Sequence, residues 1–151
     1  MTLEAIQSLL PYSPPFLFVD QLIHIDENGA KGQYTFPVDS FFYKGHFKNF
    51  PITPGVILTE TMAQIGVVSL GIFLMRAQIQ DGLKPQIALS SHEVDFYQPV
   101  FPGEKVIARS EKLYFRFGKL KCKVELFNEA EQLVCRGVIA GMMKRKPDET
   151  K

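Results

Sequence analysis

Hydrophobic periodicity predicts one long buried helix near the middle of the chain. The segment from residue 55 to about residue 80 is helical in pattern, with Thr53 as its N-cap and Pro54 at its first position. Apolar residues surround nearly its whole circumference, so neighbouring elements must cover it on most sides. The pattern ends near Asp81 and Gly82. This helix is expected to form the centre of the fold.

Strand-like patterns flank this helix on both sides. A short helix over residues 2 to 10 precedes two expected strands, residues 16 to 26 and 30 to 36, which are joined by a turn at residues 27 to 29. Alternation of apolar and charged residues is clearest between residues 119 and 126. The later expected strand segments are 86 to 90 with 94 to 97, 104 to 117, 120 to 127 and 133 to 144.

These elements predict an α+β domain in which a curved antiparallel sheet wraps the helix. We expect residues 1–151 to form a single domain, with its core at about residues 9–144. One curved sheet covers only part of an all-round apolar helix. A second copy of the chain would supply the missing cover, so the pattern also predicts a homodimer.

Composition narrows the class of protein. Of 151 residues, 46% are hydrophobic, and 17 basic against 16 acidic residues leave a formal charge of +1, which argues against nucleic-acid binding. The apolar stretch between Glu60 and Arg76 has fifteen residues, too few for a membrane span. The first residues lack a secretory pattern, so we expect a cytoplasmic protein. Its two cysteines should be reduced.

Two residues are candidates for acid–base chemistry. His46 lies in a loop expected over residues 39 to 54, and Glu60 follows it by fourteen positions as the only acid of the apolar helix. Burial would raise the pKa of Glu60 and keep a proton available for general-acid catalysis. Alternatively, Glu60 is exposed or capped by a polar neighbour, and His46 is an ordinary loop histidine. His24 and His92 lack metal-ligand spacing, so no metal site is expected.

The start of the helix is a second candidate site. The backbone amides of Gly55 and Val56 have no partner within the helix and point toward the positive end of its dipole, so they could polarise a carbonyl. Gly55 permits close approach of a ligand. A Pro-Gly helix start with nothing bound is equally compatible with this short motif.

Several motifs together resemble a known family. The segments LPYSPPFLFVD (10–20), GHF (45–47), PITPGV (51–56), ETMAQ (60–64) and PVFPGE (99–104) occur in this order. The chain resembles the hotdog-fold 3-hydroxyacyl-(acyl-carrier-protein) dehydratases of the FabZ/FabA type over about residues 9 to 144. The resemblance implies a hotdog fold and dehydration of 3-hydroxyacyl thioesters to trans-2-enoyl thioesters, without a metal or redox cofactor.

The resemblance also implies roles for individual residues. His46 would take the proton from the carbon beside the thioester carbonyl, and Glu60 would help the 3-hydroxyl leave as water. Gly55 would bind the thioester oxygen through its amide, Gln64 would orient the acid, and Phe96 would lie beside the acyl tunnel. In the family, the histidine and the acid come from different subunits of a dimer, which occurs alone or as a trimer of dimers.

The implied substrate is carried by an acidic acyl carrier protein. FabZ enzymes commonly have basic residues where this chain has Tyr97 and Gln98, so docking could instead use Lys44 with Lys48, or the basic run at residues 144 to 146. Six aromatic residues are candidates for the tunnel, or are ordinary core: Phe42, Tyr43, Phe47, Phe50, Phe96 and Phe101.

Two other functions remain open from the sequence. A hotdog thioesterase would need a carboxylate that activates water, and would release a free thiol. A non-catalytic acyl-binding subunit of a polyketide or pigment pathway would bind acyl chains without turnover. The His46 and Glu60 spacing favours the dehydratase.

Overall fold

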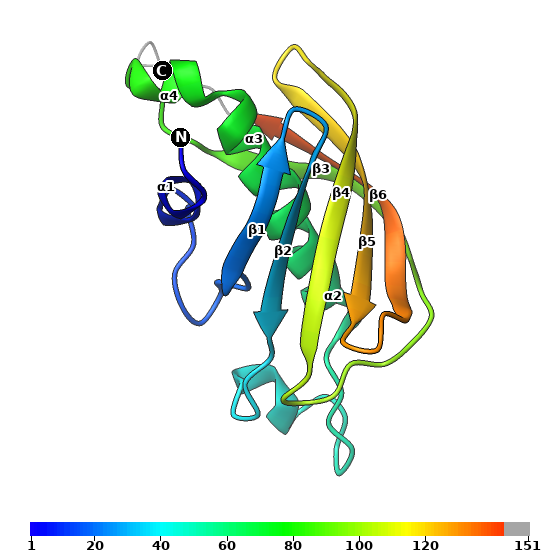
Figure 1. The fold of residues 1–151 in the computed structure, drawn as a ribbon. Coiled ribbons are helices and arrows are strands. Elements are labelled where there is room, and N and C mark those ends of the chain that lie inside the picture. The colour runs from blue at the N-terminus through cyan, green and yellow to red at the C-terminus, as the bar shows by residue number, and fades with distance from the viewer. Residues whose placement is uncertain (144–151) are drawn as a thin grey trace, which may run out of the picture.

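A six-stranded antiparallel sheet curves around a central helix in the computed structural model, which describes residues 1–143 (Figure 1). The strands lie in the order β1-β2-β4-β5-β6-β3. This arrangement confirms the expected α+β wrap. The strands are β1 (Gln21–Asp26), β2 (Gly29–Thr35), β3 (Ile87–Phe96), β4 (Lys105–Arg116), β5 (Lys119–Asn128) and β6 (Leu133–Met143).

The central helix is built from consecutive segments. They are α2 (Gly55–Met62), a wider π-helical stretch η2 (Ala63–Val68), α3 (Ser69–Leu74) and, after a break at Met75, α4 (Arg76–Gln80). By length and composition, Gly55–Leu74 could cross a membrane, but 83% of its apolar 18-residue window is buried inside the fold. It therefore packs here as the core helix that the pattern predicted.

The expected N-cap at Thr53 is wrong. Pro54 occupies the cap position in an extended conformation, and the helix begins at Gly55. The hydroxyl of Thr53 instead lies 2.6 Å from the hydroxyl of Tyr43, which belongs to the 3-10 turn η1 (Phe41–Lys44). The Thr53 amide donates to the Val100 carbonyl at 2.8 Å. Thr53 thus ties the helix start to two loops rather than capping it.

The N-terminal elements are shorter than their patterns suggested. Helix α1 (Leu3–Ser8) begins as expected, because the Thr2 hydroxyl accepts a hydrogen bond from the Ala5 amide at 3.0 Å. Strand β1 starts only at Gln21, so residues 16–20 are not part of the sheet. They form a strap, held to the central helix by hydrogen bonds between Gln64 and the backbone of Phe16 and Phe18. Their strand-like composition reflects burial of Phe18 and Val19 rather than ladder pairing.

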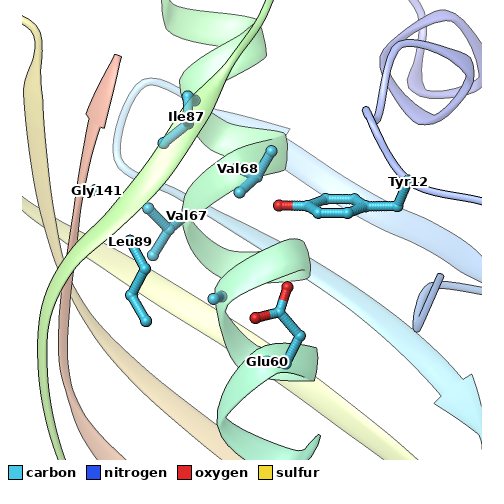
Figure 2. Close-up of a pocket in the computed structure, with 8 residues that line it drawn as sticks. Tyr12, Glu60, Val67, Val68, Ile87, Leu89 and Gly141 are labelled. Carbon is cyan, nitrogen blue, oxygen red and sulfur yellow. The ribbon is translucent and has the colours of Figure 1, made fainter. Parts of the chain in front are cut away.

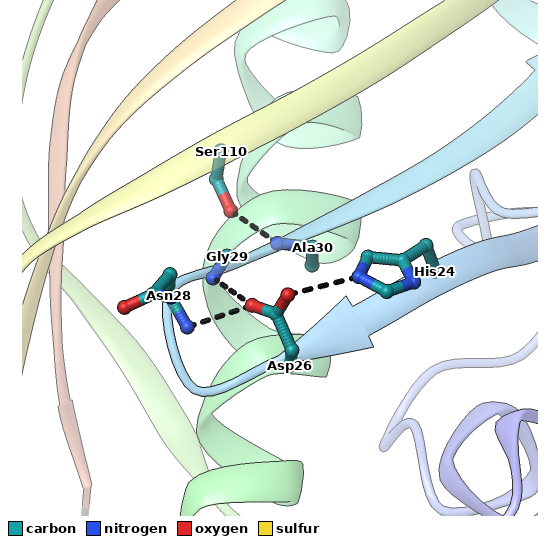
Figure 3. A network of polar contacts seen from close by, with 6 residues as sticks. All are labelled: His24, Asp26, Asn28, Gly29, Ala30 and Ser110. Atoms are coloured by element: carbon teal, nitrogen blue, oxygen red, sulfur yellow. Dashed lines mark hydrogen bonds and ion pairs between the residues drawn. The ribbon is translucent and has the colours of Figure 1, made fainter.

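A polar network closes the hairpin between β1 and β2 (Figure 3). The Asp26 carboxylate accepts hydrogen bonds from the amides of Asn28 and Gly29, and it pairs with His24 at 2.9 Å. These contacts lower the pKa of Asp26, the His24 bond most of all. Ser110 accepts from the Ala30 amide and donates to the Gly66 carbonyl, linking the hairpin to the helix. His24 is therefore structural, as expected.

Strand β3 lies at one edge of the sheet. The sequence suggested two separate segments here, but residues Ile87–Phe96 form one strand, with a bulge between Leu89 and Ser91. Among the described strands it pairs only with β6, and most of its residues are exposed. A side chain at Gly137 of β6 would collide with the β3 backbone, which explains a glycine at this point. The outer edge of β3 is available for pairing.

The sheet and the helix share one hydrophobic cluster. Cys122 and Cys135 lie in it on adjacent strands as free thiols, and burial raises the pKa of each to about 12. Residues 144–151 lie outside the described residues. They include the end of the last expected strand, the polar tail and the basic run considered for carrier docking.

Packing against the helix should dominate stability. Ile65 is fully buried, so we expect Ile65→Ala to lower the free energy of unfolding by about 2–5 kcal/mol, measured by urea denaturation. Val38 is 70% exposed, so Val38→Ala should change the free energy of unfolding by less than about 0.5 kcal/mol. Equal effects of the two substitutions would contradict the assigned core.

Candidate active site

Gln64 is the centre of the hydrogen bonding around Glu60. It is fully buried, and its side-chain nitrogen donates to the Glu60 carboxyl at 3.0 Å and to the Phe16 carbonyl at 3.1 Å. Its side-chain oxygen accepts from the Phe18 amide at 2.8 Å. Gln64 therefore fixes both the acid and the strap over the helix, as expected of a residue that orients the acid.

The π-helical stretch holds the backbone of Gln64 as well. The amide of Ser69, five residues later, donates to the Gln64 carbonyl, and the Ser69 hydroxyl donates to the same oxygen at 2.9 Å. A widened turn of this kind is frequent at functional sites. The backbone and the side chain of Gln64 are thus held at the same time.

Glu60 is an isolated acid in apolar surroundings. Burial raises its pKa, and the hydrogen bond from Gln64 partly offsets this rise. Within residues 1–143 no basic side chain forms an ion pair with it. The carboxyl group can therefore stay protonated at pH values above its ordinary pKa. General-acid catalysis needs this property.

Tyr12 faces Glu60 across a small cavity (Figure 2). The cavity lies between the helix, Tyr12 and strands β3 and β6, and apolar side chains such as Val68 and Leu89 form its walls. Burial and the nearby charge of Glu60 both raise the pKa of Tyr12. Sequence reasoning assigned no role to Tyr12, because its only signal was membership of the LPYSPPFLFVD motif.

His46 lies in a narrow turn before the helix. The amide of Ile52 donates to the His46 carbonyl at 2.9 Å, and the backbones of Phe47 and Phe50 form a pair of hydrogen bonds. The ring nitrogen Nδ1 of His46 lies 3.0 Å from the Ile52 carbonyl. Because a carbonyl only accepts, Nδ1 is the donor, and Nε2 is the ring nitrogen left to act as a base.

The helix start brings Gly55 and Phe96 together. A Cβ atom on Gly55 would lie 3.1 Å from Cζ of Phe96, so the Phe96 ring covers the first turn of the helix. The Pro54 carbonyl accepts from the amides of Ile57 and Leu58, which leaves the amides of Gly55 and Val56 outside the helical ladder. Val56 is 76% exposed. The first turn can therefore offer amide donors to a bound carbonyl.

The predicted site residues form two groups within one chain. Glu60 and Gln64 are in direct contact, and Gly55 and Phe96 are in contact at the helix start. No hydrogen bond or ion pair among residues 1–143 joins His46 to Glu60, and His46 does not line the cavity beside Glu60. Within residues 1–143 of a single chain, the acid and the histidine therefore have no direct polar contact with each other.

The six candidate tunnel aromatics occupy different surroundings. Tyr43 is buried and Phe42 packs against the hydrophobic cluster. The other four are exposed in the single chain: Phe47, Phe50, Phe96 and Phe101. Within residues 1–143 no cluster of three or more His, Cys, Asp or Glu side chains could hold a metal ion.

Comparison with known proteins identifies the family. The model of the FabA-like domain matches residues 10–115. The chain belongs to the FabA-like family. It is 33% identical over 141 residues to the 3-hydroxyacyl-[acyl-carrier-protein] dehydratase FabZ of Caldicellulosiruptor saccharolyticus, covering 93% of this chain and 96% of that protein. It is 32% identical over 146 residues to FabZ of Chlamydia muridarum, covering 95% and 93% of the two chains.

Solved structures share the fold at low sequence identity. A dehydratase heterocomplex, ApeI:P from Xenorhabdus doucetiae, matches with a TM-score of 0.78 at 15% identity, covering 93% of this chain and 91% of that one. The thioesterase HI1161 from Haemophilus influenzae matches with a TM-score of 0.71 at 14% identity, covering 100% and 96%. These matches show the expected hotdog fold for this FabA-like chain.

The raised pKa of Glu60 makes stability depend on pH. The folded chain keeps this proton to a higher pH than the unfolded chain, so ionising Glu60 costs folding free energy. Stability should fall as pH rises from the ordinary value of 4.5 through the raised pKa. Glu60→Gln should remove this fall, measured by urea unfolding at a series of pH values and one protein concentration. Glu129→Gln, at an exposed position, should keep the fall in stability with rising pH. Identical profiles for the wild type and Glu60→Gln would contradict the assigned burial of Glu60.

Proposed function

We propose that the chain is a 3-hydroxyacyl-[acyl-carrier-protein] dehydratase of fatty-acid or related acyl biosynthesis. It would remove water from 3-hydroxyacyl thioesters and yield trans-2-enoyl thioesters. The observation that supports this most strongly is Glu60, a partly buried acid with a raised pKa, oriented by Gln64 on the core helix of a FabA-like chain. The names of the FabZ relatives support the same reaction.

The chemistry divides between two side chains. Nε2 of His46 would take a proton from C2 of the substrate, because Nδ1 is engaged with the Ile52 carbonyl. The negative charge that develops on the thioester oxygen would be stabilised by the Gly55 amide at the helix start. Protonated Glu60 would donate to the 3-hydroxyl as the C3–O bond breaks. Water then leaves, and the C2–C3 double bond forms.

We infer that the active site forms between two copies of the chain. The acid and the histidine of one chain do not meet, while β3 has an unpaired outer edge next to the cavity beside Glu60. Pairing of two β3 edges would extend the sheet across a homodimer and cover exposed apolar residues such as Leu89. Sedimentation measurements would decide whether three such dimers associate. A cytoplasmic location stays a prediction.

The carrier protein would dock beside the loop that holds His46. Lys44 and Lys48 are both exposed and flank His46 in the sequence, so they can attract an acidic carrier near the site entrance. Tyr97 is half exposed and uncharged, and its ring lies under the guanidinium group of Arg136. It therefore offers no charge to an acidic carrier. We therefore propose that the attraction is on the loop rather than at the end of β3.

Loss of either proposed catalytic group should abolish most turnover. His46→Ala and Glu60→Gln should each lower kcat for 3-hydroxyacyl thioester dehydration by about 10²–10⁴-fold, followed by enoyl absorbance. His24→Ala and Glu129→Gln serve as matched controls at exposed positions and should retain wild-type rates. Full activity of either site variant would overturn the assignment, and release of free thiol would favour thioesterase activity instead.

Mixing the two inactive variants tests whether the site is shared. If His46 and Glu60 act across the dimer, a His46→Ala subunit paired with a Glu60→Gln subunit contains one intact site. Random mixing should then restore about a quarter of wild-type turnover, since half of the dimers are mixed and each has one of two sites. No recovery in confirmed mixed dimers would place both groups in the same subunit.

Docking by the two lysines predicts a selective effect on carrier-linked substrates. The double variant Lys44→Glu with Lys48→Glu should raise KM for the carrier-linked substrate about tenfold, because two weak attractions become repulsions. Activity on a short thioester mimic should stay within about twofold, as should both activities of Lys31→Glu, another exposed lysine. An unchanged KM on the carrier substrate would contradict this docking surface.

A further inference from the structure

The cavity beside Glu60 has two polar groups in apolar surroundings. Its walls include Val67 and Val68 of the helix and Ile87 and Leu89 of β3, while Tyr12 and Glu60 are its titratable residues. Figure 2 shows the Tyr12 hydroxyl and the Glu60 carboxyl directed into the same space. A phenol and a carboxyl group that share a small apolar space are suited to bind a small polar molecule between them.

The cavity is large enough for water. Its volume is about 60 Å³, above the roughly 10–15 Å³ that one water molecule occupies by this measure. A buried water also needs polar partners, usually two to four of them. Glu60 and Tyr12 meet the lower end of that requirement without any change in the fold.

Both groups have hydrogen-bonding capacity to spare. Gln64 donates to one carboxyl oxygen of Glu60, and among residues 1–143 no donor occupies the other. The Tyr12 hydroxyl has no hydrogen-bond partner in that part of the chain. Burial and the charge of Glu60 raise the pKa of Tyr12, so the phenol stays protonated and can donate. Both groups are therefore able to bind a third molecule.

We propose that Tyr12 and Glu60 together hold the water molecule that dehydration releases and that hydration consumes. This inference rests on the proposed dehydratase function. In the forward direction, the C2–H bond breaks and its proton goes to His46, the C3–O bond breaks, and the departing hydroxyl takes the Glu60 proton to become water. The Tyr12 hydroxyl then donates to the oxygen of this water, while the Glu60 carboxylate accepts one of its hydrogens.

The reverse reaction uses the same water. The Glu60 carboxylate removes a proton from it as its oxygen bonds to C3, and His46 returns a proton to C2. Tyr12 would keep the water next to C3 between these events. Its contribution is therefore to the lifetime of the bound water, beyond any contribution to packing.

Tyr12→Phe removes the hydroxyl and keeps the ring. We expect kcat for hydration of the enoyl thioester to fall about tenfold, the effect of one lost hydrogen bond in a charged network, because the water is a reactant in that direction, while KM stays within about twofold. Tyr114→Phe, on strand β4, is the matched control and should have wild-type kinetics. Wild-type kcat in Tyr12→Phe would overturn the inference.

An isotope measurement separates water retention from packing. The substrate carries ¹⁸O at the 3-hydroxyl and deuterium at C2, and recovered molecules that have lost deuterium are those that reacted and returned. In the wild type these molecules should keep much of their ¹⁸O, because the same water adds back to C3. Tyr12→Phe should lower this retention several-fold. Equal retention in the two proteins would contradict a water-holding role.

Filling the cavity gives an independent check. Ala63 lines the cavity, and Ala63→Val would occupy its space while leaving Tyr12 and Glu60 unchanged. We expect lower kcat and lower ¹⁸O retention again, and wild-type values of both would overturn the proposal. If the wild type does not dehydrate any 3-hydroxyacyl thioester, the proposed function itself fails. If it does so and Tyr12→Phe is unaffected, only the role of Tyr12 fails.

Discussion

The site depends on the hydrogen bonds that the buried side-chain amide of Gln64 makes on the surface of an apolar helix. A buried amide is costly unless its donors and its acceptor find partners, and here they reach Glu60, the Phe16 carbonyl and the Phe18 amide. The same three bonds orient the acid and bind the strap to the helix. Satisfying one buried polar group thus couples the fold of the N-terminal segment to the geometry of the acid.

The surroundings of Glu60 follow from that arrangement. Tyr12 and β3 partly bury the acid on the second turn of the helix, and this burial raises its pKa without a basic partner among residues 1–143. Packing alone would favour an apolar residue at this position. The chain accepts this energetic cost and, in the proposed reaction, gains a proton donor at pH values above the ordinary pKa of a glutamate. The facing Tyr12 would extend this polar pair to the water that the reaction makes.

The open edge of β3 and the separation of His46 from Glu60 have a common explanation in the proposed dimer. A long edge strand exposes unpaired backbone groups, which proteins usually cover. A second copy would cover them and bring a histidine-bearing loop toward the acid. The homodimer was expected from the apolar circumference of the helix, and the exposure of β3 is a separate observation that supports it.

Residue patterns were sufficient for the elements whose surroundings are encoded locally. Alternation along β5 and the apolar helix starting at Gly55 were read correctly, and Glu60 was noticeable as a single acid in that helix. Errors arose where side chains found distant partners. Thr53 resembles a cap but bonds to Tyr43, and residues 16–20 resemble a strand but bond to Gln64. Local preference cannot show which of two possible hydrogen bonds forms.

The sequence by itself determined the fold class, the family resemblance and the candidates His46, Glu60, Gly55, Val56, Gln64 and Phe96, because periodicity and motif order are properties of the chain. Only the tertiary structure placed Tyr12 opposite Glu60, stacked Phe96 on Gly55 and left β3 at an edge. The first two relations join residues that are 48 and 41 positions apart in the sequence. They depend on how the helix crosses the curved sheet, and no local pattern carries that information.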